Sequence, residues 1–178
     1  MHRERNEVIL VDTENTKLGI MDKYEAHTKG ELHRAFSVFI FNGNGELLLQ
    51  QRAAKKYHGA NLWTNTCCSH QQASETTLEA ANDRLDYEMG LQANLQEIFS
   101  FIYHAEVENN LIEHELDIVL FGIHNQDPIP NLEEVKDFKW IGIDELEKWM
   151  KEKPEEFTYW FKDAWHRVKE HMLKEIKI

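Results

Sequence analysis

Short apolar runs alternate with polar stretches along the chain, and this pattern predicts several strands interleaved with a few helices. Within residues 34–51, the runs FSVFIF and ELLLQ flank the sequence NGNG at 42–45, which is typical of a hairpin turn. Further strands are expected over residues 8–11, 98–107, 112–123 and 135–141. Residues 12–22 and 53–72 have no sustained period, so loops are expected there.

Three helices are expected where apolar residues recur every three or four positions. The first spans residues 74–90, and its buried face is expected to hold Leu78, Ala81, Leu85 and Met89. Asp144 followed by Glu147 has the spacing of a capping box, which predicts a second helix that ends near Met150. The third, over residues 154–174, carries Phe157, Trp160, Phe161, Ala164, Trp165, Val168 and Met172. This order predicts an α+β or mixed α/β fold in one domain over residues 1–178.

The composition excludes several classes of partner. The 178 residues include 32 acidic and 20 basic side chains, which give a formal net charge of −12, and 42% are hydrophobic. Such a chain is typical of a globular protein, and its charge argues against nucleic acid or an anionic membrane as partner. The apolar run at 8–11 is too short for a secretory signal, and the two adjacent cysteines form no disulfide framework. A cytoplasmic protein is therefore expected.

Three acidic residues share one face of the expected strand over 112–123. The period of two puts Glu113, Glu115 and Asp117 together, with the first two about 7 Å apart. Two such carboxylates in a central strand repel each other and lose solvation, so they need a cation or protons; the alternative is an exposed edge. The chain has ten histidines, and those proposed as partners are His27, His33 and His70. Imidazole with carboxylate suits a divalent first-row ion.

The remaining seven histidines, including His58, are expected to be ordinary surface or packed residues. The cysteines lie in the loop sequence WTNTCCSH, where Cys67 is expected to be a small buried apolar residue. Cys68 is two residues from His70, and a thiol in such a setting is expected to have a lowered pKa and to act as acid, base or nucleophile.

A candidate anion site is formed by basic residues that are otherwise scarce in this chain. Arg84 and Glu88 are one helical turn apart, which is consistent either with an ordinary ion pair or with a phosphate ligand beside a metal ligand. Lys23, Arg52 and Lys56 could converge with them. Trp160 is expected in the core, with a cation–π role as the alternative.

Residues 69–91 resemble a degraded Nudix box, the pattern G-x5-E-x7-R-E-U-x-E-E-x-G-U. The positions kept are Glu75, Leu85, Glu88, Gly90 and Leu91. The positions lost are the first Gly (Ser69), the Arg-Glu pair (Asp83-Arg84) and the first of the tandem glutamates (Tyr87). Because that tandem holds Mg²⁺ in Nudix hydrolases, the resemblance disfavours pyrophosphate hydrolysis of a nucleotide or prenyl diphosphate, which stays the alternative function.

These departures, together with WTNTCCSH, the H-x5-H spacing of His27 and His33, and Glu113-His-Glu115, resemble the type 1 isopentenyl-diphosphate isomerases. Two differences are Gln71, where a Pro commonly follows the loop histidine, and Ser69, where some members carry Gly. The resemblance implies an α/β/α sandwich with a mixed sheet. It also implies isomerisation of isopentenyl to dimethylallyl diphosphate in isoprenoid biosynthesis, through a tertiary carbocation.

The resemblance further implies a role for each candidate residue. The metal ligands would be His27, His33, His70, Glu113 and Glu115, around one Mn²⁺, Zn²⁺ or Mg²⁺. Glu88 would hold a Mg²⁺ that bridges the substrate diphosphate. The phosphate oxygens would be bound by Lys23, Arg52, Lys56 and Arg84. The acid and base would be Cys68 and Glu115, with Tyr103 and Trp160 beside them. The expected partner is a small diphosphate. The protein would be a monomer or homodimer. Its N-terminal metal-ligand segment would span about residues 1–33.

Overall fold

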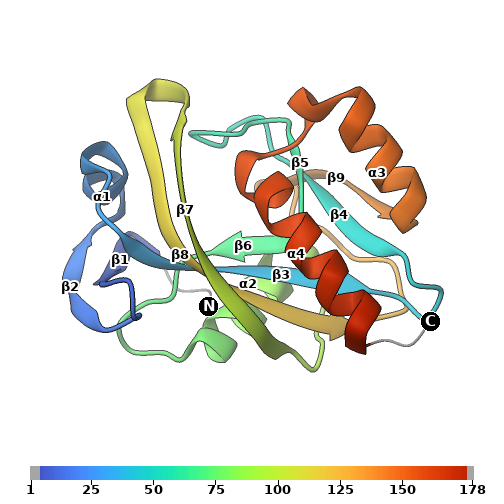
Figure 1. Ribbon diagram of the computed structural model, residues 1–178, viewed down its shortest axis with the longest axis horizontal. Coiled ribbons are helices and arrows are strands. Elements are labelled where there is room, and N and C mark those ends of the chain that lie inside the picture. The colour runs from blue at the N-terminus through green and yellow to red at the C-terminus, as the bar shows by residue number, and fades with distance from the viewer. Residues whose placement is uncertain (1–4, 176–178) are drawn as a thin grey trace.

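The computed structural model describes residues 5–175, which build one mixed sheet of nine strands with helices on both faces (Figure 1). The strands are β1 (Glu7–Val11), β2 (Lys17–Asp22), β3 (His33–Phe41), β4 (Leu47–Arg52), β5 (Trp63–Thr64), β6 (Cys67–Ser69), β7 (Gln96–Val107), β8 (Leu111–Ile123) and β9 (Val135–Ile141). The helices are α1 (Lys23–Lys29), α2 (Thr77–Met89), α3 (Ile143–Glu152) and α4 (Tyr159–Glu175), with single 3-10 turns at Glu108–Asn110 and Pro154–Glu156. None of the helices within residues 5–175 has the length and apolar character needed to cross a bilayer.

Strand β3 is central because it pairs with neighbours on both of its edges. It runs parallel to β8, with His33 opposite Glu115, and antiparallel to β6, with Ser37 opposite Cys68. The long β7–β8 hairpin then adds a further strand, in which Tyr103 faces Glu115. The register of these strands therefore brings three segments that are distant in sequence to one place.

Alternate residues of β3 belong to apolar clusters on opposite faces of the sheet, as a strand buried on both faces requires. One cluster joins Phe36, Val38 and Ile40 to Leu85 and Met89 of α2. The other joins Phe39 and Phe41 to Phe161 and Trp165 of α4. Figure 1 shows α4 in front of the sheet with α2 behind it. The expected α/β/α arrangement with a mixed sheet is confirmed.

Residues 12–22 are only partly a loop, because β2 and then α1 follow Thr16. The two-turn helix α1 is too short to show an apolar period, but both of its ends are defined. Asp22 accepts a hydrogen bond from the backbone N–H of Glu25, and Gly30 ends the helix in the left-handed region at φ 69°. This short helix carries His27 toward the sheet.

The expected hairpin over residues 34–51 is present at its turn but not along its strands. β3 and β4 pair only at Phe41 and Leu47, because β3 continues beside β6 and β8 while β4 pairs with β5 and β9. The expected loop over 53–72 is likewise interrupted by β5 and β6. Pairing with distant strands therefore overrides the local turn signal.

Helix boundaries differ from the sequence-based expectation in three places. Helix α2 begins at Thr77, where Thr76 and Glu79 form a capping box, and Leu78 points to solvent with 40% of its surface exposed. The expected capping box at Asp144 is wrong, because Asp144 lies inside the first turn of α3, which begins at Ile143. The residue at the N-cap is Gly142, which has no side chain to accept a hydrogen bond. Phe157 is buried but precedes α4. Gly90 ends α2 in the left-handed region, as expected.

Candidate active site

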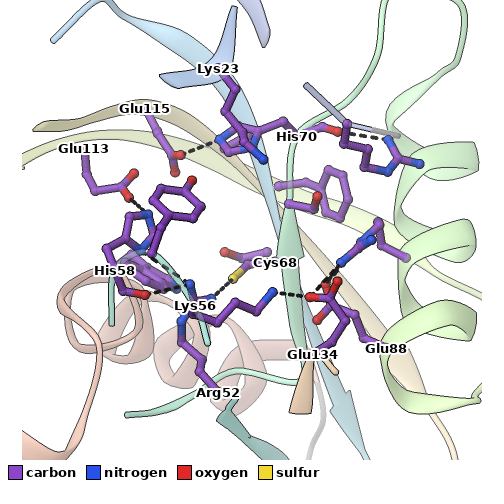
Figure 2. A pocket seen from close by; sticks show the side chains of 18 of the residues that line it. Lys23, Arg52, Lys56, His58, Cys68, His70, Glu88, Glu113, Glu115 and Glu134 are labelled. Carbon is purple, nitrogen blue, oxygen red and sulfur yellow. Dashed lines mark hydrogen bonds and ion pairs between the residues drawn. The ribbon is translucent and has the colours of Figure 1, made fainter. Parts of the chain in front are cut away.

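A cavity of about 320 Å³ lies where β3, β6 and β8 meet α2 and α4. Of the residues expected at the site, those that line it are Lys23, Arg52, Lys56, Cys68, His70, Arg84, Glu88, Tyr103, Glu113, Glu115 and Trp160. Figure 2 shows Glu113 and Glu115 on one side of Cys68, with Glu88 and Glu134 on the other. We call the first side, with His27, His33, His70, Glu113 and Glu115, the histidine end. We call the cations that line the cavity, Lys23, Arg52, Lys56 and Arg84, together with Glu88 and Glu134, the basic end.

Backbone carbonyls fix the two fully buried histidines of the histidine end. Nδ1 of His27 lies 2.7 Å from the carbonyl of Lys23, and Nδ1 of His33 lies 2.8 Å from the carbonyl of Glu31. A carbonyl only accepts, so in the neutral ring each Nδ1 carries the hydrogen and each Nε2 presents a lone pair. This is the tautomer that metal-ligating histidines adopt.

These lone pairs face carboxylates rather than donors. Nε2 of His27 lies 3.4 Å from Oε2 of Glu113, and Nε2 of His33 lies 3.4 Å from Oε1 of Glu115. Within the described part of the chain, neither Nε2 has a hydrogen-bond partner. His70 completes the cluster, with its Nε2 2.8 Å from Oε1 of Glu115. Unpartnered buried nitrogens beside two carboxylates need a cation between them.

The histidine end therefore fits a divalent metal ion. The ligand atoms of His27, His33, His70 and Glu115 all lie within 4.8 Å of one another. Imidazole nitrogens with carboxylate oxygens form a donor set typical of first-row divalent ions. Burial disfavours a charged His27, yet the carboxylate of Glu113 beside its Nε2 and the charge of Glu115 raise its pKa to about 9, so without a metal this Nε2 binds a proton. The cluster thus attracts positive charge even without a metal.

In the basic end, two of the four cations, Lys56 and Arg84, are held by carboxylates of the same end. Arg84 donates to Oε1 of Glu88 at 2.5 Å, while Gln50 donates to its Oε2 at 2.9 Å. Glu134 forms an ion pair with Lys56 and lies 3.4 Å from Arg84. Burial and the charges of Lys56 and Arg84 lower the pKa of Lys23. The basic residues therefore converge, as expected.

Cys68 and Tyr103 lie between the two ends. The Tyr103 hydroxyl donates a hydrogen bond of 2.6 Å to Oε2 of Glu115. On the other side, Nη1 of Arg52 lies 3.9 Å from the sulfur of Cys68. The cavity thus presents a thiol and a hydrogen-bonded carboxylate to a bound molecule.

Comparison with known proteins assigns the family. The NUDIX domain model matches residues 31–161. A curated isopentenyl-diphosphate Delta-isomerase of Pectobacterium atrosepticum is 48% identical over 165 residues, 93% of this chain and 92% of the relative. An isopentenyl-diphosphate Delta-isomerase 1 of Aromatoleum aromaticum is 46% identical, over 92% of each chain. The chain belongs to the isopentenyl-diphosphate Delta-isomerase family within the Nudix fold.

Solved structures with much lower identity share the fold of this isomerase-family chain. A MutT protein of Methanosarcina mazei has a TM-score of 0.63 at 19% identity and covers 79% of this chain and 94% of its own. A NUDIX hydrolase from Nitrosomonas europaea has a TM-score of 0.58 at 18% identity, over 77% and 88%. These likenesses support the α+β fold alone.

Within this isomerase-family chain, several positions of the Nudix box make contacts with neighbouring side chains, and one keeps a carboxylate in the cavity. Arg5 pairs with Glu75 and lies 2.8 Å from Asp83, so both carboxylates are held by one guanidinium. Tyr87, in place of the first tandem glutamate, lies beneath the guanidinium of Arg84 at 4.8 Å. Glu88 is the tandem position that keeps its carboxylate, which faces the cavity.

The expected low pKa of Cys68 is wrong. Burial raises its pKa to about 12, although the charge of Arg52 acts in the opposite direction. The thiol is therefore protonated near neutral pH. Cys67 is fully buried, as expected for a small apolar residue.

Among the cavity-lining residues that sequence reasoning did not assign to the site, His58 and Glu134 contact residues that it did assign. His58 was expected to be an ordinary surface or packed residue, but its Nε2 lies 2.5 Å from Oε1 of Glu113. Its position two residues after Lys56, in an otherwise small and polar loop, is the signal that could have pointed to it. Glu134 gives no such signal, because only the β4–β9 pairing brings it beside Lys56.

Proposed function

We propose that this chain isomerises isopentenyl diphosphate to dimethylallyl diphosphate, as the names of its relatives indicate for them. The observation that carries the proposal is a protonated, half-buried thiol, Cys68, in one cavity with the carboxylate of Glu115. A proton added to the terminal alkene carbon gives a tertiary carbocation, and loss of a proton from the second carbon gives the product. One proton enters and one leaves, so the reaction needs no oxidant or reductant.

Cys68 and Glu115 are the proposed acid and base, in an order that we leave open because the two groups interact. Tyr103 supports the pair, since its hydroxyl holds Oε2 of Glu115 in place. A metal ion bound by the histidine end would neutralise the two carboxylates and adjust the proton affinity of Glu115. The proposed ion is Mn²⁺, Zn²⁺ or Mg²⁺.

The basic end is the proposed diphosphate site. Its phosphate-binding residues would be Lys23, Arg52, Lys56 and Arg84, which line the cavity. Glu88 would hold the Mg²⁺ that accompanies the diphosphate, and its carboxylate is already oriented by Gln50. Four cations and a divalent ion can offset a diphosphate in a chain whose net charge is −12.

Trp160 is the proposed aromatic wall against which the carbocation forms. Its side chain is 95% buried at the cavity, and the guanidinium of Arg52 lies 5.1 Å from its ring. An aromatic face stabilises a nearby cation and excludes water that would capture it. Trp160 is therefore buried, as expected for a core residue, and it also lines the cavity, as its cation–π role would require.

A proton-exchange assay tests the proposal. Incubation with isopentenyl diphosphate in D₂O is expected to give dimethylallyl diphosphate with deuterium in a methyl group and no free phosphate. Cys68→Ala is expected to lower kcat by about 10³-fold. The matched control Cys67→Ala removes the neighbouring thiol, which does not line the cavity, and should stay within about threefold.

Hydrolysis is the alternative that this assay separates. Release of phosphate without deuterium in the five-carbon unit, together with full activity of Cys68→Ala, would overturn the isomerase proposal. The loss of the tandem glutamate at Tyr87 argues against that outcome. The single domain, the cytoplasmic location and the monomeric or homodimeric state stay predictions.

A further inference from the structure

His58 connects the two ends of the cavity. Its ring lies between Glu113 of the histidine end and Arg52 of the basic end, as Figure 2 shows. Nε2 lies 2.5 Å from Oε1 of Glu113, while Nδ1 lies 3.4 Å from Nη2 of Arg52. The side chain is 92% buried, so both contacts are shielded from water.

The contacts of His58 determine which ring nitrogen carries the hydrogen. A guanidinium has only donors, so Nδ1 of His58 must accept from Arg52. The hydrogen of the neutral ring then lies on Nε2, which donates to Glu113. A nitrogen that carries a hydrogen has no lone pair for a metal ion.

His27 and His33 are the opposite case. Their Nδ1 atoms face backbone carbonyls, which leaves each Nε2 with a lone pair toward the carboxylates. His58 therefore differs from both in tautomer, although its Nε2 lies close enough to Glu113 and His27 to form a group of potential ligands with them. Proximity alone would make His58 a ligand, and the hydrogen-bond pattern argues against it.

Glu113 is divided between the two histidines. Oε1 accepts from His58, and Oε2 lies 3.4 Å from Nε2 of His27. Neighbouring rings hold His58 in this position: the Tyr57 ring centroid is 4.3 Å away, and that of Trp160 is 5.6 Å away in an edge contact. A fixed donor on Oε1 directs Oε2 toward the lone pairs of the cluster.

We propose that His58 is a positioning residue, which holds Glu113 in the orientation needed for metal binding without ligating the ion itself. This inference rests on the proposed function, because it assumes that the histidine end binds a divalent ion. Residues of this kind, which hold a ligand by a hydrogen bond, typically change metal affinity by about 10–100-fold when they are replaced.

Three variants separate this role from direct ligation. His58→Phe keeps an aromatic ring against Tyr57 and Trp160 but removes the donor to Glu113. His58→Gln keeps an amide N–H near the position of Nε2. His166→Phe is the matched control, because His166 is exposed on α4. Thermal melts check that each variant is folded before binding is compared.

Mn²⁺ binding, followed by EPR of the free and bound ion, is the main measurement. His58→Phe is expected to raise the Kd by about 10–100-fold, His58→Gln to restore it to within about threefold, and His166→Phe to leave it unchanged. Electron spin-echo spectroscopy is expected to detect the same number of coordinated imidazoles in all four proteins. The KM for the diphosphate should change little in His58→Phe, because Arg52 also donates to the backbone carbonyl of His58 at 3.1 Å.

Two results would overturn the proposal while leaving the proposed function intact. An unchanged Mn²⁺ Kd in His58→Phe would show that Glu113 needs no such support. If electron spin-echo spectroscopy detected one coordinated imidazole fewer in His58→Gln than in the wild-type protein, His58 would itself be a ligand. The same would follow if the wild-type protein bound a second Mn²⁺ that His58→Gln did not bind. If the wild-type protein bound no Mn²⁺, the metal part of the proposed function would fail as well, so the two failures are distinguishable.

Discussion

The two ends of the cavity differ in how their buried charges are compensated by neighbouring side chains. In the histidine end, buried carboxylates face imidazole lone pairs, and the unpartnered Nε2 atoms of His27 and His33 leave a demand for positive charge. In the basic end, Arg84 is paired with Glu88 and Lys56 with Glu134, so two of its four cations are paired internally. One end lacks a cation, whereas the other holds two more cations than carboxylates before any ligand binds.

This difference indicates an order of events. A metal ion that enters the histidine end displaces a proton from His27 but competes with no Lys or Arg, because among the residues described only histidines pair with the carboxylates of this end. A diphosphate at the basic end must compete with Glu134 for Lys56 and Arg84. Breaking a buried pair is costly unless the newcomer replaces the lost charge, which a diphosphate does.

The largest expected effect comes from Glu115→Gln in the histidine end. This change removes the charge that Tyr103 and the histidines share, while keeping the shape of the side chain. We expect kcat to fall by at least about 10³-fold and Mn²⁺ affinity to fall with it, as measured by product formation and by metal titration. Glu106→Gln on the exposed face of β7 is the control, with no change expected. Retention of activity would remove Glu115 from the chemistry.

A metal titration with and without inorganic pyrophosphate tests the contrast directly. In calorimetry, the protein alone is expected to bind one Mn²⁺ tightly, and a second ion about 100-fold more weakly, because Arg84 already occupies Oε1 of Glu88. With pyrophosphate present, the second Mn²⁺ should bind with an affinity comparable to that of the first. Pyrophosphate supplies oxygen ligands to this ion and binds Arg84, which then releases Glu88. Two equally tight ions without pyrophosphate would show that the two ends do not differ in this respect.

The sequence predicts the histidine end better than its surroundings. The period of two along β8 correctly places Glu113 and Glu115 together, because strand geometry leaves little freedom. The position of His27 depends on α1, whose two turns are too short for an apolar period and are defined by caps at Asp22 and Gly30. The residues alone therefore indicate His27, His33, His70 and the four basic residues as candidates, and the family resemblance assigns each of them its role.

The residues that were missed depend on contacts between distant segments. His58 lies in the loop after β4 and reaches Glu113 of β8, while Glu134 reaches Lys56 across the β4–β9 pairing. Neither contact has a local period or motif, since both are set by strand order. The hairpin over residues 34–51 shows the same limit, because its turn is local and correct while its strands are separated by distant partners.

The smallest expected effect, from Glu134→Gln, tests whether the basic end is restrained by its own carboxylate. Removing the charge frees Lys56 and Arg84, so we expect inorganic pyrophosphate to bind about threefold more tightly in metal-free buffer, as measured by calorimetry. Glu133→Gln is a matched control, because that neighbouring carboxylate is exposed and pairs with Lys55. Weaker binding in Glu134→Gln would instead mean that Glu134 orients the two cations for the diphosphate. In that case Glu134 would hold Lys56 and Arg84 in the orientation that binds the diphosphate, rather than compete with the diphosphate for them.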